Sequence, residues 1–229
     1  MTAVVIVAAG RGTRMGADRN KVFLSLRGEP ILVRTVRAFA SCDRIDGPVV
    51  VVTGREEIGE VSEMLNRAGL SCRVVPGGQD RQESVYLGLS ALPAQVDYVA
   101  IHDGARPLVS RRVIESALEC ARVHGSGVAA VQVVDTIKTV DEQGRVTSTP
   151  PRSALRAVQT PQVFRADLIR AAHERHRGPE RATDDAMLFE AEGLPVYLSE
   201  GERQNLKITT PEDLILAEQI LKKREEESR

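Results

Sequence analysis

The chain has 229 residues, of which 42% are hydrophobic and 28% are charged, a composition typical of folded globular proteins rather than of disordered or membrane-embedded ones. Its formal net charge of −1, from 31 basic and 32 acidic side chains, excludes the strongly basic surface that is typical of nucleic-acid-binding proteins. The three cysteines, at positions 42, 72 and 120, are far apart and form no CxxC pair, which argues against a disulfide framework or a zinc site.

The first predicted element is a strand over residues 4–8. Because it begins so close to Met1, it leaves no room for a signal or transit peptide. No apolar stretch approaches the roughly 18 residues of a membrane-spanning helix. We therefore expect a cytoplasmic protein without a membrane partner.

Short apolar runs alternate with amphipathic stretches over the first 133 residues. The runs, which we expect to be strands buried on both faces, cover residues 4–8, 48–53, 72–75, 98–102 and 127–133. The stretches between them have apolar residues at helical spacing and cover residues 30–40, 55–68, 81–92 and 110–124. This order predicts an α/β fold with a Rossmann-like, doubly wound, mostly parallel sheet. At this length we expect a single domain.

The pattern changes after residue 133. Residues 136–140 and 145–149 flank a four-residue loop that ends in Gly144, which predicts a protruding β-hairpin. A polar hairpin that leaves an α/β core often contacts another subunit, so we expect a dimerisation arm at about 135–153. We then expect helices over 165–176 and 184–192 and a strand over 195–198. The sequence Thr210-Pro211 followed by Asp213 predicts the start of a final helix, with Thr210 as its N-cap.

A glycine-rich segment with the sequence AAGRGTRMG, residues 8–16, follows the first strand directly. Successive backbone N–H groups in such a loop form a site for anions, and Arg14 and Lys21 add full positive charges for a triphosphate. The spacing is neither that of a Walker loop nor GxGxxG. The alternative is a turn that only connects a strand to a helix.

Two further segments contain charged residues at positions suited to a binding site. Asp103, in the sequence IHDGARP, ends the fourth predicted strand at the edge where open α/β sheets bind ligands. It could hold Mg²⁺, or it could cap the next turn. Lys207, in NLKITTPED, lies just before the final helix, where a cation gains nothing from the helix dipole. It is either a ligand-binding lysine or a surface one.

The segment 8–16 resembles the signature of nucleotidyltransferases that activate sugars and sugar alcohols, although Asn20 replaces the Pro that usually precedes the lysine. Together with IHDGARP, NLKITTPED and Thr160-Pro161-Gln162, it is similar to the 2-C-methyl-D-erythritol 4-phosphate cytidylyltransferases over most of the chain. The resemblance implies a nucleotide-diphospho-sugar transferase fold, CTP as co-substrate and Mg²⁺ or another divalent cation. It further implies that CMP passes from CTP to 2-C-methyl-D-erythritol 4-phosphate, with release of pyrophosphate.

The resemblance also implies roles for individual residues. The catalytic group would be Arg14, Lys21 and Lys207. The nucleotide would contact Ala8, Ala9, Gly10, Gly12, Gly78, Ser84 and Asp103, with Gly78 and Ser84 reading the cytosine edge and Asp103 also holding the metal. The acceptor would contact Arg106, Thr136, Arg152, Thr160 and Thr183, with Thr136 and Arg152 supplied by the partner of a homodimer. An alternative for Thr183, which precedes two acidic residues, is a helix N-cap.

Two other functions stay open at this point. A ribitol 5-phosphate cytidylyltransferase would share the nucleotide half and differ in its acceptor pocket, and a non-catalytic nucleotide-binding module would bind without turnover. The histidines have no metal-ligand spacing with the cysteines. We expect His102 to be buried with its hydrogen bonds satisfied, and His173 and His176 to lie on a polar helix surface.

Overall fold

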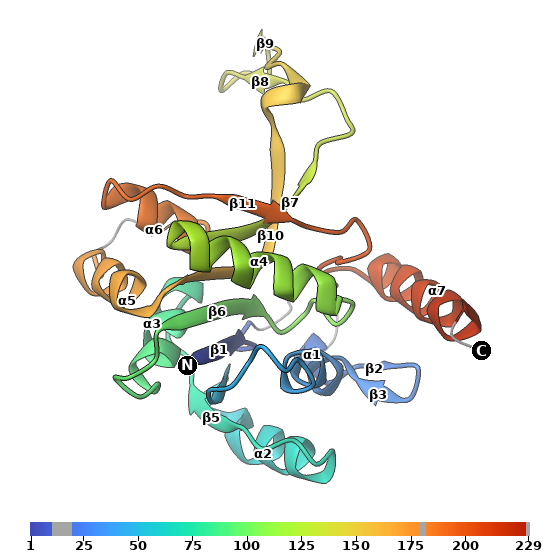
Figure 1. Cartoon of the computed structure of the whole chain (residues 1–229). Helices are drawn as coiled ribbons and strands as arrows, with labels where there is room; N and C mark the ends of the chain where they lie inside the picture. Colours follow the sequence, from blue (N-terminus) through green and yellow to red (C-terminus); the bar gives the residue numbers. More distant parts are fainter. Residues whose placement is uncertain (11–19, 179–181, 228–229) are drawn as a thin grey trace.

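The computed structural model describes residues 1–10, 20–178 and 182–227. Within these ranges seven strands form one sheet in the order β11-β7-β10-β6-β1-β4-β5 (Figure 1). β10 runs antiparallel to β6 and β7, and the other pairings are parallel. The strands are β1 Thr2–Val7, β4 Val49–Thr53, β5 Arg73–Pro76, β6 Tyr98–Asp103, β7 Ser126–Gln132, β10 Arg156–Arg165 and β11 Leu198–Glu200. The prediction of a mostly parallel α/β sheet is confirmed.

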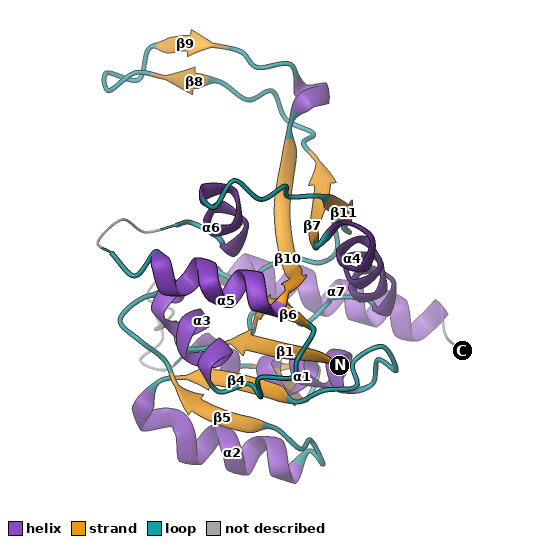
Figure 2. Cartoon of the chain, turned by 60° about the vertical axis from the view of Figure 1, so that its left-hand side comes forward, coloured by secondary structure: helices purple, strands orange, loops and turns teal. Residues whose placement is uncertain are grey.

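Helices cover both faces of the sheet (Figure 2). One face packs against α1 Ile31–Ala40, α2 Ile58–Arg67 and α4 Arg111–His124. The other face packs against α3 Arg81–Ser90, α5 Ala166–Arg175 and α6 Asp185–Ala191. Along β1, Val4 and Ile6 lie in the first core and Ala3 and Val5 in the second. The continuous apolar run of β1 therefore follows from burial on both faces.

The last helix, α7 Pro211–Glu227, begins where the sequence predicts. One carboxylate oxygen of Asp213, Oδ2, accepts a hydrogen bond from the Thr210 N–H at 2.8 Å, and Thr210 Oγ1 accepts one from the Asp213 N–H at 3.3 Å. This reciprocal pair is a capping box. Ala217 and Leu221 of α7 are buried in a third apolar cluster with Ile208. The cluster fixes the segment just before α7, which contains Lys207.

The predicted hairpin is present. β8 Thr139–Val140 and β9 Val146–Ser148 pair antiparallel, and both views show them projecting well beyond the sheet between β7 and β10 (Figures 1 and 2). Apolar side chains on this arm are exposed, namely Val134, Ile137, Val140 and Val146. Exposed apolar residues grouped on a projecting segment are typical of a contact surface.

Two parts of the sheet differ from the prediction. No strand was predicted over the residues of β10, whose centre contains Pro161, a residue that cannot donate to a sheet ladder. The pairing with β7 shifts register between Val158 and Gln162, and this irregularity accommodates the proline. β11 begins at Leu198, where the predicted strand over 195–198 ends. A short hairpin of β2 Ser25–Leu26 and β3 Glu29–Pro30 was also not predicted. Among the described residues, each helix is too short or too polar to cross a bilayer.

Candidate functional site

A cavity of about 550 Å³ opens at the carboxyl ends of the parallel strands, beside β1, β5 and β6. Several of the residues implied by the resemblance line it together, namely Ala8, Ala9, Gly10, Lys21, Gly78, Ser84, Asp103 and Lys207. This is the position at which open α/β sheets bind ligands. Gly12 and Arg14 lie outside the described residues.

Asp103, the last residue of β6, lies among three cations. Its carboxylate is 3.0 Å from Lys207 Nζ, and 3.4 Å from both Arg81 Nε and Arg106 Nε. Burial alone would raise the pKa of Asp103, but the neighbouring Arg81, Lys207 and Arg106 outweigh burial and hold that pKa well below its usual range. The site therefore presents an ionised carboxylate inside a positively charged pocket.

The backbone of Asp103 is fixed by a buried chain of hydrogen bonds. Thr160 Oγ1 accepts from the Asp103 N–H at 3.1 Å and lies 3.0 Å from His102 Nδ1. His102 Nε2 lies 3.2 Å from the Arg106 carbonyl, which can only accept, so Nε2 carries the proton and Thr160 donates to Nδ1. Burial lowers the pKa of His102 to about 3, which keeps the ring neutral. The predicted buried, satisfied histidine is confirmed.

Thr160 is thus an internal residue in this structure. Its side chain is buried, and its hydroxyl is used by His102 and by the Asp103 backbone. The register shift in β10 places it there. Contact between Thr160 and a substrate stays a prediction.

The segment that contains Lys207 is attached to the loop after β6. The Ile208 N–H donates to the Ala105 carbonyl at 2.8 Å, and Arg106 Nη1 donates to the Asn205 carbonyl at 2.8 Å. The fully buried Asn205 side chain donates from Nδ2 to the Thr160 carbonyl at 2.8 Å. These bonds bring Lys207 to Asp103 although the two residues are far apart in the sequence.

Asn20 anchors the segment before Lys21. Its Nδ2 donates to the Ala8 carbonyl at 2.7 Å and to Glu57 Oε2 at 3.1 Å, and its Oδ1 accepts from the Val22 N–H at 3.3 Å. Asn20 is 5% exposed. The residue that departs from the usual Pro therefore holds Lys21 beside the end of β1 by hydrogen bonds instead of by a fixed ring.

The loop between β5 and α3 closes the cavity on one side. Ser84 Oγ accepts from the Gly78 N–H at 3.1 Å and donates to the Asp80 carbonyl at 2.7 Å. A Cβ on Gly77 would lie only 2.5 Å from the Ala9 Cβ, so glycine allows this loop to approach the end of β1. Since a hydroxyl has two acceptor lone pairs, Ser84 retains one acceptor site.

Arg81 is a pocket residue that the sequence reasoning missed. It lines the cavity and links two carboxylates: Nε is 3.4 Å from Asp103 Oδ1, and Nη2 is 2.8 Å from Asp185 Oδ2. Burial opposes the charge of Arg81, but Asp185 and Asp103 more than offset burial and raise its pKa. The sequence signal was its place in the same local segment as Gly78 and Ser84.

The prediction for His173 is wrong. His173 is fully buried, and its Nε2 lies 3.1 Å from Asp185 Oδ1. The buried carboxylate of Asp185, on α6, accounts for the buried position of His173, because a polar ring can be buried when it is hydrogen-bonded. His176, which directly follows the last residue of α5, is partly exposed and lies 2.9 Å from Glu192.

The remaining acceptor candidates lie away from the cavity lining. Arg106 contacts Asp103 from the side, with its side chain 13% exposed. Thr136 and Arg152 are exposed on the arm, where Arg152 Nη1 donates to the Val134 carbonyl. Thr183 is exposed, and the N-cap of α6 is its neighbour Asp184, which accepts from the Met187 N–H at 3.1 Å.

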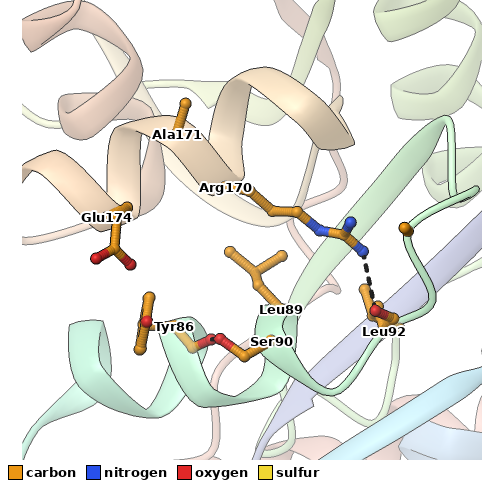
Figure 3. A pocket seen from close by; sticks show the side chains of 8 residues that line it. Tyr86, Leu89, Ser90, Leu92, Arg170, Ala171 and Glu174 are labelled. Atoms are coloured by element: carbon orange, nitrogen blue, oxygen red, sulfur yellow. Dashed lines mark hydrogen bonds between the residues drawn. The ribbon is translucent and has the colours of Figure 1, made fainter.

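A separate cavity of about 400 Å³ lies between α3 and α5 (Figure 3). Tyr86 and Leu89 of α3 face Arg170 and Glu174 of α5 across it, and Arg170 Nη2 donates to the Leu92 carbonyl at 3.3 Å. None of the residues singled out from the sequence lines this cavity.

The donors available to a metal are few. The described parts of the chain contain no group of three His, Cys, Asp or Glu residues that could enclose an ion. Two carboxylate residues line the cavity, Asp80 and Asp103, and Asp80 Oδ1 already accepts from the Glu83 N–H at 2.9 Å. Mg²⁺ commonly takes one or two carboxylates and completes its shell with substrate phosphates and water. Asp103 fits an ion bound in that way.

Comparisons with known proteins identify the family of this chain. The family described as 2-C-methyl-D-erythritol 4-phosphate cytidylyltransferase matches residues 2–223. The curated protein of that name from Desulforamulus reducens is 48% identical over 225 residues, which cover 96% of this chain and 95% of that protein. The one from Symbiobacterium thermophilum is 46% identical over 228 residues, covering 99% and 94%.

Solved structures give the same result. The crystal structure of 4-diphosphocytidyl-2C-methyl-D-erythritol synthase from Anaerococcus prevotii has a TM-score of 0.86 at 30% identity and covers 96% of this chain and 98% of that one. The 2-C-methyl-D-erythritol 4-phosphate cytidylyltransferase from Thermus thermophilus has a TM-score of 0.78 at 37% identity, with the same coverage. The chain therefore belongs to the 2-C-methyl-D-erythritol 4-phosphate cytidylyltransferase family.

Proposed function

We propose that this chain transfers CMP from CTP to 2-C-methyl-D-erythritol 4-phosphate and releases pyrophosphate. The observation that carries the proposal is the cavity that Lys21, Arg81, Lys207 and Asp103 line together, in a chain 48% identical to a curated enzyme of that name. The product is 4-diphosphocytidyl-2-C-methyl-D-erythritol.

The reaction joins two anions. A non-bridging oxygen of the acceptor phosphate attacks the α-phosphorus of CTP in line and forms the new P–O bond. The bond from the α-phosphorus to the oxygen that bridges to the β-phosphorus breaks, and pyrophosphate leaves with the electron pair. A phosphate monoester is largely ionised at neutral pH, so no general base is needed. The enzyme must position the anions and stabilise the negative charge of the transition state.

Three residues supply that charge in the proposal. Lys21 and Lys207 line the cavity and would hold phosphate oxygens, and Arg14, outside the described residues, would add a third cation. Asp103 would hold Mg²⁺, which when bound neutralises phosphate charge. Because Asp103 already has Arg81, Arg106 and Lys207 beside it, the metal would share its carboxylate with them.

Ser84 and Gly78 would read the base. The acceptor lone pair that Ser84 retains suits a hydrogen-bond donor, and cytosine has an amino group where uracil has an oxygen acceptor. A buried acceptor left without a donor is costly, so this arrangement would favour CTP over UTP.

The acceptor phosphate would lie near Arg106, Thr160 and Thr183. Thr136 and Arg152 would come from the arm of a partner subunit, since in one chain both are exposed on the arm and do not line the cavity. The exposed apolar residues of the arm support a homodimer. Light scattering should give twice the 25.0 kDa mass of one chain. Arg152→Ala should raise KM for the acceptor more than KM for CTP. A 25.0 kDa particle in light scattering, or an equal rise of the two KM values in Arg152→Ala, would contradict the shared site.

Cys42, Cys72 and Cys120 are all free thiols, which suits the cytoplasm that we propose as the compartment.

The proposed reaction is tested by pyrophosphate release with CTP and Mg²⁺. We expect turnover with 2-C-methyl-D-erythritol 4-phosphate and far less with ribitol 5-phosphate at the same concentration, with the cytidylylated product identified by mass. Preference for ribitol 5-phosphate would replace the acceptor but keep the nucleotide site. CTP binding without pyrophosphate release from either acceptor would instead indicate a non-catalytic module.

A further inference from the structure

A continuous line of polar contacts leads from α5 to the centre of the cavity. His173 of α5 contacts Asp185 of α6 at 3.1 Å, Asp185 contacts Arg81 of α3 at 2.8 Å, and Arg81 contacts Asp103 of β6 at 3.4 Å. Only Arg81 and Asp103 line the cavity described above. The outer two residues, His173 and Asp185, therefore reach the cavity through Arg81.

Arg81 is held more closely by the remote carboxylate than by the one in the cavity. Its Nη2 hydrogen bond to Asp185 is shorter by 0.6 Å than its Nε contact with Asp103, as the distances 2.8 and 3.4 Å give. Asp103 has two further cations, Lys207 and Arg106. Asp185 is thus the stronger anchor of Arg81, and Asp103 does not depend on Arg81 alone.

Asp185 is itself held in place on several sides. Its side chain is 1% exposed, and burial would raise its pKa, but Arg81 and His173 outweigh burial and lower that pKa. An ionised carboxylate only accepts hydrogen bonds, so His173 Nε2 carries the proton that it shares with Asp185. The first turn of α6 is fixed by Gln162 of β10, which accepts from the Ala186 N–H at 3.0 Å.

We propose that Asp185 and His173 are positioning residues of this active site. Resting on the proposed function, the inference is that they hold the Arg81 guanidinium at the cavity wall, where it faces the phosphates of CTP. Without Asp185, Arg81 would pair with Asp103 alone. That closer pair would withdraw positive charge from the phosphates and block the carboxylate of Asp103.

The first test is the dissociation constant of CTP, measured by titration calorimetry on the full chain. Asp185→Asn keeps the size of the side chain and removes its charge, and should weaken CTP binding about 10- to 100-fold, the range of a charge-assisted hydrogen bond. Glu192→Gln is the matched control, because Glu192 links α5 to α6 through His176 at 2.9 Å but does not contact Arg81. It should bind CTP as the wild type does; an equal loss in both variants would overturn the inference.

A double-mutant cycle separates positioning from general destabilisation. If Asp185 acts through Arg81, adding Asp185→Asn to Arg81→Gln should not weaken CTP binding further. A full additional loss in that background would show another route and overturn the inference.

His173 gives a second series in case Asp185→Asn does not fold. His173→Gln can place an amide N–H near the position of Nε2 and should bind CTP within about threefold of the wild type, whereas His173→Leu cannot donate and should lose about tenfold. Equal binding by these two variants would overturn the inference. These tests measure CTP binding and not turnover. A wild-type chain that binds CTP but releases no pyrophosphate would contradict the proposed function, while the variants would still test this inference. A wild-type chain that binds no CTP would overturn both the proposed function and this inference.

Discussion

Replacing Thr160 with valine removes one hydroxyl and keeps the shape of the side chain. In the wild-type chain this hydroxyl lies 3.1 Å from the Asp103 backbone nitrogen and 3.0 Å from His102 Nδ1. The change to valine leaves both buried groups without a hydrogen-bond partner. Each unpaired buried group costs about 1–3 kcal/mol. We therefore expect Thr160→Val to lower the free energy of unfolding by about 2–6 kcal/mol.

Urea denaturation followed by circular dichroism measures this loss, with Thr160→Ser as the control. Serine keeps the hydroxyl and loses one methyl group, so it should cost only about 1 kcal/mol. Turnover should fall in Thr160→Val because Asp103 loses its backbone support, and should largely return in Thr160→Ser. A valine variant as stable as the wild type, with only a raised KM for the acceptor, would refute the internal role and favour substrate contact instead.

Three further changes test other parts of the site. Asn20→Ala removes the hydrogen bonds to Ala8 and Glu57 and should lower kcat/KM for CTP about tenfold; an unchanged value would mean that Lys21 is positioned in another way. Ser84→Ala frees the Gly78 N–H and should reduce the preference for CTP over UTP about tenfold, so an unaltered ratio would remove Ser84 from base reading. His102, with a pKa lowered to about 3, stays neutral in the folded chain while the unfolded chain gains a proton below about 6.5. Stability should therefore fall by about 2 kcal/mol from pH 7 to pH 5 without added metal, and His102→Leu should flatten this slope; parallel curves would mean that His102 protonates freely.

The sequence predicts the parallel half of the fold well, because its strands are continuous apolar runs. Val49–Thr53, for example, is buried at every position. A strand that is buried on both faces has a continuous apolar sequence, which is recognisable without the structure. β10 could not be predicted in this way, because polar residues occupy its buried centre. Gln159, Thr160 and Gln162 are buried only because distant partners bond them, and Gln162 reaches Asp184 at 2.8 Å. Periodicity carries no information about such partners.

The candidate site also contains residues that the sequence predicts and residues that it does not. Gly78, Lys21 and Asp103 belong to local segments in which glycines and charges follow a predicted strand, so their convergence at one sheet edge could be expected from topology. Arg81 and Asp185 are 104 positions apart, and nothing in either local segment specifies that they meet.

His173 illustrates the physical reason most directly. Two histidines at helical spacing read as a polar face, and for His176 that is partly true, since its side chain is 35% exposed. His173 lies one turn earlier and is fully buried, because α6 brings a carboxylate that is 1% exposed within 3.1 Å of it. A buried charge must be paired and hydrogen-bonded, so Asp185 requires both Arg81 and a second donor. The position of His173 is therefore set by the charge that it contacts across the helix pair, and only the packed structure identifies that charge.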